Sequence, residues 1–236
     1  MKIIFSPSKE MNFKGKFDLH NSFDIDLSNK FDKIYEKLVD LSKEEISKKF
    51  KIKNEILDEF LKDLQEFHNL PEKKAIEAYS GLAFRQLKID EYTQKNWRYI
   101  QEKVFILSAF YGITRGTCKI KKHRLDFSIK LFEDISLYKF WSEYVNSFFI
   151  EKEVVINLAS NEYSKLIDKK RIDLIDLNFY ENGELKQISA NSKKARGEML
   201  NLLIKNQIEN IEEIKTLKLK EYSYNKEISS INNLVF

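Results

Sequence analysis

Two short segments of the sequence carry side chains that could convert a bound anion. Residues 6–9 (SPSK) follow an apolar run, and a serine three residues before a lysine could be a nucleophile beside its base. Residues 157–163 (NLASNEY) follow a second apolar run, where α/β proteins place ligand-binding groups. The alternative role of this segment is to cap the following helical turn. The candidate catalytic residues are Ser6, Lys9, Asn157, Ser160 and Glu162.

A third segment, residues 192–197 (SKKARG), places three cations at the start of an expected long helix. Cations are unfavourable there, because the free amides and the dipole of a helix N-terminus attract anions. Residue types that oppose the stability of their own helix are typical of a functional site. We therefore expect Lys193, Lys194 and Arg196 to bind an anion, together with Lys9.

The net charge of +4 is concentrated in two stretches of the chain. Residues 115–130 carry a charge of +5 and residues 186–197 a charge of +4, which leaves −5 for the rest. This asymmetry indicates a polyanionic partner, although a lysine run can also be a solvated face. The first stretch adds five candidate anion-binding residues: Arg115, Lys119, Lys121, Lys122 and Arg124.

Arginine is rare in this chain, with six residues among 41 basic ones. Its planar guanidinium binds phosphate or carboxylate through two parallel hydrogen bonds, so a rare arginine in a lysine-rich chain suggests that geometry. Arg85, Arg115 and Arg196 each lie within four residues of a glycine, which lets the backbone approach a ligand closely. Some of the six arginines are expected to form structural ion pairs instead.

The sequence offers little to a metal ion or a cofactor. It has three histidines and one cysteine, and none of them is paired at ligand spacing. No phosphate-binding loop, dinucleotide fingerprint or nucleophile elbow is present. A single cysteine, no long apolar run and no signal peptide favour a cytoplasmic protein that does not contact a membrane. We expect no metal site and no cofactor.

Hydrophobic periodicity predicts one mixed α/β domain over residues 1–236, with a central sheet flanked by helices and a helix-rich N-terminal half. Asn182-Gly183 is typical of a two-residue hairpin turn. Two further short strands are possible in the tail, at 217–224 and 234–236. The main expected strands are 2–5, 154–156 and 173–180, and the main expected helices are 29–41, 56–67, 90–103, 136–149 and 192–207.

Residues 110–113 (FYGI) lie between segments that could be helical, although residues 104–107 could equally be a buried strand. A hydrophobic–Gly–hydrophobic hairpin between two helices offers backbone amides to a DNA phosphate without reading base sequence. Under this hypothesis Tyr111 and Gly112 lie in the hairpin, and the basic stretch after it extends the contact.

Taken in order, these segments closely resemble the YaaA family of bacterial peroxide stress resistance proteins. The resemblance implies a single α/β domain in the cytosol that lowers available intracellular iron. It also implies DNA binding through a basic cleft with a helix-hairpin-helix-like element. Four positions depart from the family: Gly116 replaces a proline, Lys122-His123 replaces Pro-Tyr, and Ser8 replaces an alanine. The matching segments are SPSK (6–9), YSGLAF (79–84), LSAFYGITR (107–115), HRLDF (123–127), VVINLASNEYSKL (154–166) and KKARGEM (193–199).

Two functions remain open at this point. The leading hypothesis is a peroxide stress protein that binds duplex or distorted DNA through phosphate contacts and limits iron-dependent damage. The alternative is an enzyme that acts on a phosphorylated or nucleic-acid substrate in the same cleft. A narrow pocket lined by 6–9, 157–163 and 193–197 would favour an enzyme, and an open groove as wide as a duplex would favour DNA. Chemistry on a nucleic-acid end or base would satisfy both.

Overall fold

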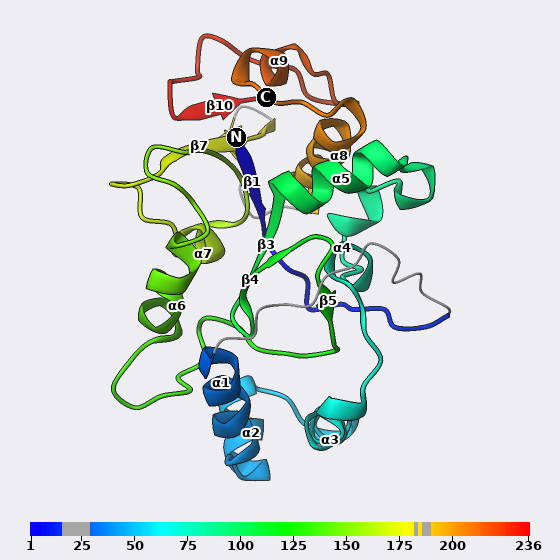
Figure 1. The fold of residues 1–236 in the computed structure, drawn as a ribbon, viewed down its shortest axis with the longest axis vertical. Helices are drawn as coiled ribbons and strands as arrows, with labels where there is room; N and C mark the ends of the chain where they lie inside the picture. Colours follow the sequence, from blue (N-terminus) through cyan, green and yellow to red (C-terminus); the bar gives the residue numbers. More distant parts are fainter. Residues whose placement is uncertain (16–28, 182–183, 186–189) are drawn as a thin grey trace.

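A six-stranded sheet forms the centre of the computed structural model, which describes residues 1–15, 29–181, 184–185 and 190–236 (Figure 1). Within these residues the strand order is β10-β7-β6-β1-β3-β4, and only β4 runs antiparallel to its neighbour. The mixed α/β architecture is therefore confirmed. The strands are β1 (Lys2–Phe5), β3 (Val104–Ser108), β4 (Gly112–Arg115), β6 (Val154–Leu158), β7 (Asp173–Asn178) and β10 (Asn233–Val235).

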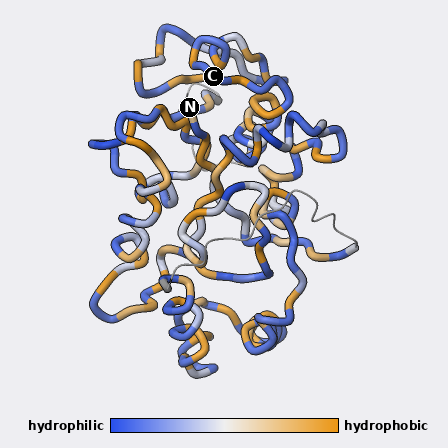
Figure 2. Tube along the Cα trace, viewed as in Figure 1, coloured by the Kyte–Doolittle hydropathy of each residue, from blue (hydrophilic) through white to orange (hydrophobic). Residues whose placement is uncertain are grey.

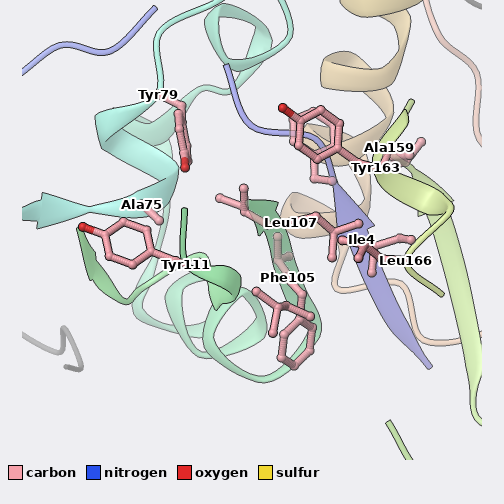
Figure 3. Close-up of a cluster of buried hydrophobic side chains, with 14 of the residues drawn as sticks. Ile4, Ala75, Tyr79, Phe105, Leu107, Tyr111, Ala159, Tyr163 and Leu166 are labelled. Carbon is pink, nitrogen blue, oxygen red and sulfur yellow. The ribbon is translucent and has the colours of Figure 1, made fainter. Parts of the chain in front are cut away.

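The middle strands are buried on both faces, which explains why they read as continuous apolar runs rather than alternating ones. All five residues of β3 are buried, as are the last three of β1 and the last four of β6. The same strands form the apolar centre of the trace in Figure 2. Aromatic and aliphatic side chains from the strands and their connections pack over them, including Phe105, Leu107 and Tyr163 (Figure 3).

The strand order creates a switch point at β1. β3 pairs on one side of β1, whereas β6, which comes later in the chain, pairs on the other. Connections that leave in opposite directions open a crevice at the carboxyl ends of parallel strands, where α/β proteins bind ligands. The segments 6–9 and 159–163 both leave the sheet at this edge.

Helices surround the sheet, and three of them lie at one end of the molecule (Figure 1). The helix Lys43–Phe50 begins with the capping box of Ser42 and Glu45, in which the side chain of each residue accepts a hydrogen bond from the backbone N–H of the other. The longer helices are α1 (Asn29–Val39), α2 (Lys43–Phe50), α3 (Asn54–Gln65), α5 (Gln94–Lys103), α6 (Leu137–Asn146), α8 (Ala190–Asn206) and α9 (Ile211–Thr216).

Several short elements join these parts. The tail at 217–224, expected as a strand, forms only an isolated bridge between Lys218 and Ser223. The turn expected at Asn182-Gly183 lies outside the described residues, although β8 and β9 on either side of it pair antiparallel. The short elements are β2 (Lys73–Lys74), β5 (Lys119–Ile120), β8 (Tyr180–Glu181), β9 (Glu184–Leu185), α4 (Ala75–Ala78), α7 (Asn161–Ser164), η1 (Phe67–Asn69), η2 (Phe84–Gln86) and η3 (Ile89–Glu91).

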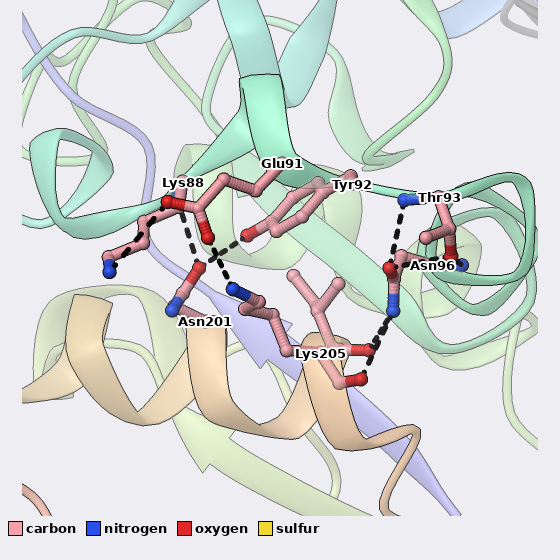
Figure 4. Close-up of polar contacts among 8 residues, drawn as sticks. Lys88, Glu91, Tyr92, Thr93, Asn96, Asn201 and Lys205 are labelled. Atoms are coloured by element: carbon pink, nitrogen blue, oxygen red, sulfur yellow. Dashed lines mark hydrogen bonds and ion pairs between the residues drawn. The ribbon is translucent and has the colours of Figure 1, made fainter.

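A polar network fixes α8 against the segment that precedes and begins α5 (Figure 4). Asn201 Oδ1 accepts hydrogen bonds from Lys88 N (3.0 Å) and from the Tyr92 hydroxyl (3.0 Å). Asn96 Nδ2 donates to the carbonyls of Ile204 (2.7 Å) and Lys205 (3.3 Å), which lie near the end of α8. Because buried polar groups are matched on both sides, α8 has one position relative to the sheet.

The network yields a stability prediction. We expect Asn96→Ala to lower the free energy of unfolding by about 2 kcal/mol, because it leaves helix-end carbonyls without a donor. Urea denaturation followed by circular dichroism measures this loss. Lys95→Ala, an exposed neighbour in the same helix, is the matched control and should change little. Equal midpoints for the two variants would contradict the role assigned to Asn96.

Candidate anion-binding site

Hydrogen bonds between Ser6 and Ser160 join the chain segments that leave the carboxyl ends of β1 and β6. Ser160 N donates to Ser6 Oγ (2.8 Å), and Ser6 Oγ donates to Ser160 Oγ (3.4 Å). The two segments that the sequence singled out, 6–9 and 157–163, are therefore neighbours across 154 residues of chain. Their contact forms one wall of a pocket.

This pocket, called here the anion pocket, has a volume of about 410 Å³. It lies between the exits of β1 and β6, the loop at 81–84 and the first half of α8. Residues of the segments 6–9, 157–163 and 193–197 all line it, which is the narrow-pocket arrangement that the sequence analysis associated with an enzyme. Its ionisable lining comprises the cations Lys9, Lys193 and Arg196 and the carboxylates of Glu10, Asp126 and Glu162.

Arg196 is the most unusual of these groups. It is only 8% exposed, and its Nε has no hydrogen-bond partner. Burial lowers the pKa of the guanidinium, and the charge of Asp176 offsets part of this effect. Among the described residues no carboxylate forms an ion pair with Arg196. A buried cation without a close counter-ion is costly, so the arrangement favours an anionic ligand.

Two glycines bring the pocket walls into contact. A Cβ at Gly197 would lie 2.0 Å from the carbonyl oxygen of Ala83, and one at Gly81 would lie 2.2 Å from Ser8 Oγ. Any side chain at Gly197 would therefore push α8 away from the loop at 81–84. The glycine beside Arg196 serves close packing of two chain segments, whereas the sequence had indicated close approach to a ligand.

The carboxylates of the pocket differ in their surroundings. Lys9 Nζ forms an ion pair with Asp126 at 2.7 Å. The pKa of Glu162 is raised, first by burial and then by the nearby charge of Asp126. Lys9 is thus directed at Asp126, and no hydrogen bond joins it to Ser6 in the described part of the chain. The expected nucleophile–base pair of Ser6 and Lys9 therefore has no contact that supports it.

The side chain of Asn157 has a structural role. Its side chain is buried, and its Nδ2 donates to Asp176 Oδ1 (2.6 Å) while its Oδ1 accepts from Ala159 N (2.9 Å). These bonds hold the chain where it turns out of β6. Ser160 and Glu162, three and five residues further on, line the pocket instead.

A second pocket of about 480 Å³ shares Lys9 and Glu10 with the first. Arg124 lines this pocket together with side chains of α3. Arg124 also lines a small cavity of about 20 Å³, together with Asp126 and Tyr163. Cations from three distant parts of the chain therefore follow one another across both pockets. We call this set the cation row: Arg124, Lys9, Lys193 and Arg196.

Other predicted cations are engaged elsewhere. Lys122 forms ion pairs with Glu59 (2.5 Å) and Asp63 (2.6 Å) of α3. Lys121 Nζ donates to the carbonyl of His68 (2.6 Å). Lys119 lies on β5, which pairs with β2, and Lys194 is exposed but does not line the anion pocket.

Arg115 is also held away from the pockets. Its Nη1 donates to the carbonyl of Gln101 (2.9 Å), and its guanidinium lies 5.1 Å from the centre of the Phe105 ring. The sequence could not show this, because both partners are set by how α5 packs on β3. Arg115 is thus one of the structural arginines that the composition led us to expect.

The hairpin at 110–113 differs from the expected element. It joins strands β3 and β4, so the helices expected on either side of it are strands. Gly112 has φ of +75°, and a Cβ there would lie 2.6 Å from the Trp141 ring, which explains the glycine. The amides of Phe110 and Tyr111 donate to Ser108 Oγ (3.1 and 3.2 Å). Because Tyr111 and Gly112 are buried and these amides are occupied, they are not placed to bind a DNA phosphate.

His123 is part-buried and belongs to an aromatic cluster that sequence reasoning did not identify. It stacks on Phe110 with ring centres 4.9 Å apart, and its Nε2 lies 3.3 Å from the Tyr79 hydroxyl. Its Nδ1 lies 2.8 Å from the carbonyl of Lys121. Burial lowers the pKa of His123 to about 4, so the ring is neutral at physiological pH. Tyr163 lines the same small cavity as Tyr79 and directs its hydroxyl toward Tyr79 (Figure 3).

The described residues contain no cluster of three or more histidine, cysteine or acidic side chains that could hold a metal ion. In the same residues no helix combines the length and the apolar character that a membrane crossing requires.

A mostly parallel α/β sheet with a pocket at its switch point is typical of α/β proteins that bind ligands at the carboxyl ends of their strands. Comparison with known proteins makes the assignment specific. The model of the family described as peroxide stress protein YaaA matches residues 1–228, and the chain belongs to this family. Membership supports a role in peroxide stress.

Relatives of the chain align over its whole length and over nearly all of their own. A UPF0246 protein of Fusobacterium nucleatum is 39% identical and covers 100% of this chain, which spans 98% of that protein. UPF0246 proteins of Francisella philomiragia and Malacoplasma penetrans are 33% and 32% identical, again over 100% of this chain and over 99% and 98% of theirs.

The part-buried His123 leads to a pH prediction. Its pKa is lower in the folded chain than in the unfolded one, so between about pH 6.5 and 4 the unfolded state binds more protons. We expect stability to fall as the pH drops through this window, and to fall less in His123→Phe. Urea denaturation at several pH values measures the difference. His68→Gln, at an exposed histidine, should retain the full dependence, and identical profiles for wild type and His123→Phe would contradict the prediction.

Proposed function

We propose that this peroxide stress protein binds DNA, and that the cation row makes the phosphate contacts. The observation that carries the proposal is the shared position of Lys9, which lines one pocket with Arg124 and the other with Lys193 and Arg196. Cations that line two adjoining pockets suit a chain of phosphates better than a single small anion, although Lys9 must then be shared with Asp126. Within the described residues, Arg124 and Arg196 form no ion pair that would compete with such a ligand.

The size of the anion pocket restricts what part of DNA can enter. A volume of about 410 Å³ is typical of small-molecule sites and cannot admit a duplex. A strand end, or a nucleotide turned out of the helix, fits this requirement. The proposal is therefore that distorted or terminal DNA, rather than intact duplex, occupies the pocket while neighbouring phosphates contact the rest of the cation row.

Limitation of iron-dependent damage is the second part of the proposal. The described residues offer no metal cluster, so protection would come from occupying damaged or exposed DNA rather than from holding iron. We place this activity in the cytoplasm, where bacterial DNA is located.

An enzyme acting on a phosphorylated or nucleic-acid substrate is a second candidate for the same pocket. The specific observation in its favour is the pair of Asp126 and Glu162. Asp126 has a cationic partner in Lys9, whereas burial and the charge of Asp126 raise the pKa of Glu162. Two carboxyl groups with different proton affinities can act as base and acid in one reaction.

Salt-dependent titration of DNA tests the proposed function. Affinity for duplex, bubble and single-stranded DNA should fall steeply with salt, by a log–log slope of about 0.9 per neutralised phosphate on duplex. We expect Arg124→Ala to lower this slope by about 0.9 and to weaken binding to bubble DNA most. Lys194→Ala, an exposed cation outside the anion pocket, is the control. Salt-independent affinity, or equal effects of the two variants, would contradict the proposal.

A further inference from the structure

We propose that the anion pocket recognises a single nucleoside monophosphate unit, with its phosphate at Lys193 and Arg196 and its hydroxyl or amino donors at Glu162 and Asp126. This inference rests on the proposed function of the same site and deepens it by naming the ligand class. It concerns a free 5′-mononucleotide as well as the terminal or turned-out unit of a DNA strand.

Charge pairing within the pocket defines its polarity. Lys9 is paired with Asp126, and Glu10 is paired with Arg85 at 2.5 Å. The groups of the lining that have no ion-pair partner among the described residues are Lys193, Arg196 and Glu162. Two unpaired cations against one unpaired carboxyl group leave a net positive charge, which one phosphate group can occupy.

The phosphate end is set by Arg196. Its guanidinium is buried with Nε lacking a partner, so a phosphate oxygen there would satisfy a donor that now has none. Lys193 lies one helical turn earlier on α8 and is exposed, which places it at the mouth of the pocket. The hydroxyls of Ser6 and Ser160 line the same wall and can donate to the remaining oxygens.

Two carboxyl groups of the lining limit the negative charge that the pocket can accept. Asp126 and Glu162 line the pocket together, and each raises the cost of a second negative charge nearby. A second phosphate would therefore be repelled, whereas sugar hydroxyls or a base amino group would donate to the carboxylate oxygens. The pocket consequently distinguishes a monophosphate from a polyphosphate.

The wall between the two ends is apolar. Phe5 and Phe84 meet edge to face with ring centres 5.2 Å apart, and Leu82 and Leu158 continue the surface. Apolar side chains beside charged groups in one lining suit a sugar and base carried by a phosphate. The volume of about 410 Å³ is in the range for one such unit.

Isothermal titration calorimetry tests the inference with 2′-deoxycytidine 5′-monophosphate, the matching nucleoside, the matching triphosphate and inorganic phosphate, and with the adenine series. We expect one monophosphate in either series to bind at least tenfold more tightly than its nucleoside and its triphosphate. Inorganic phosphate should bind more weakly than that monophosphate.

Three variants locate the two ends. Lys193→Gln should weaken monophosphate binding about tenfold, whereas Lys194→Gln, its exposed neighbour outside the pocket, should leave it unchanged. Glu162→Gln should bring the affinities of triphosphate and monophosphate closer together, because it removes the repulsive charge. Arg196→Gln should abolish binding, and the exposed Lys193 keeps the test valid if that variant does not fold.

Several results would overturn the inference: equal binding of monophosphate and triphosphate, binding of inorganic phosphate alone, or equal effects of Lys193→Gln and Lys194→Gln. The proposed function fails separately. Salt-dependent DNA binding without monophosphate binding would refute the inference and leave DNA binding in place. Monophosphate binding without DNA binding would support the inference and favour the enzyme candidate over the DNA-binding one.

Discussion

The burial of Arg196 without a close counter-ion is the constraint on which the rest of the site depends. α8 carries this residue into the interior because Gly197 packs directly against the carbonyl of Ala83, where a Cβ would lie 2.0 Å away. The network of Asn96 and Asn201 then prevents α8 from withdrawing. A cation held in this way is costly unless an anion compensates it, and the charge of Asp176 offsets only part of the effect of burial. This cost is the reason why we propose an anionic ligand at Arg196.

The remaining features shape what that ligand can be. Hydroxyls at the ends of β1 and β6 join two walls of the pocket, and carboxyl groups at its far side limit how much negative charge it accepts. Lys9 connects this pocket to the larger one beside Arg124. In the proposed function, selectivity for a phosphate unit and attraction for a longer polyanion arise from neighbouring parts of one surface.

Much of this arrangement could be predicted from the sequence. The apolar runs before Ser6 and Asn157 predicted strands of a central sheet, and the structure shows that these strands are parallel, so their carboxyl ends meet at one edge. The cations that oppose helix stability at 193–196 indicated a functional site, and two of the three line the pocket. Local patterns sufficed here because strand exits and helix starts are themselves local features.

The errors have a common physical origin. Arg115 and Lys121 bind backbone carbonyls, and the hairpin of Gly112 closes between strands, because of contacts with distant segments. His123 and Asp126 both line the small cavity between the pockets. They lie in a stretch whose dominant feature in the sequence is its positive charge, so neither was predicted to line a pocket. A residue's partner depends on tertiary packing, which one sequence without its fold does not reveal.

A crystal structure of the protein grown with 2′-deoxycytidine 5′-monophosphate tests the central claim most directly. The account predicts a phosphate within hydrogen-bond distance of the Arg196 guanidinium, close to Ser6 and Ser160 and with Lys193 at the mouth. A nucleotide bound elsewhere, with the Arg196 guanidinium still unpartnered beside an unchanged pocket, would contradict it.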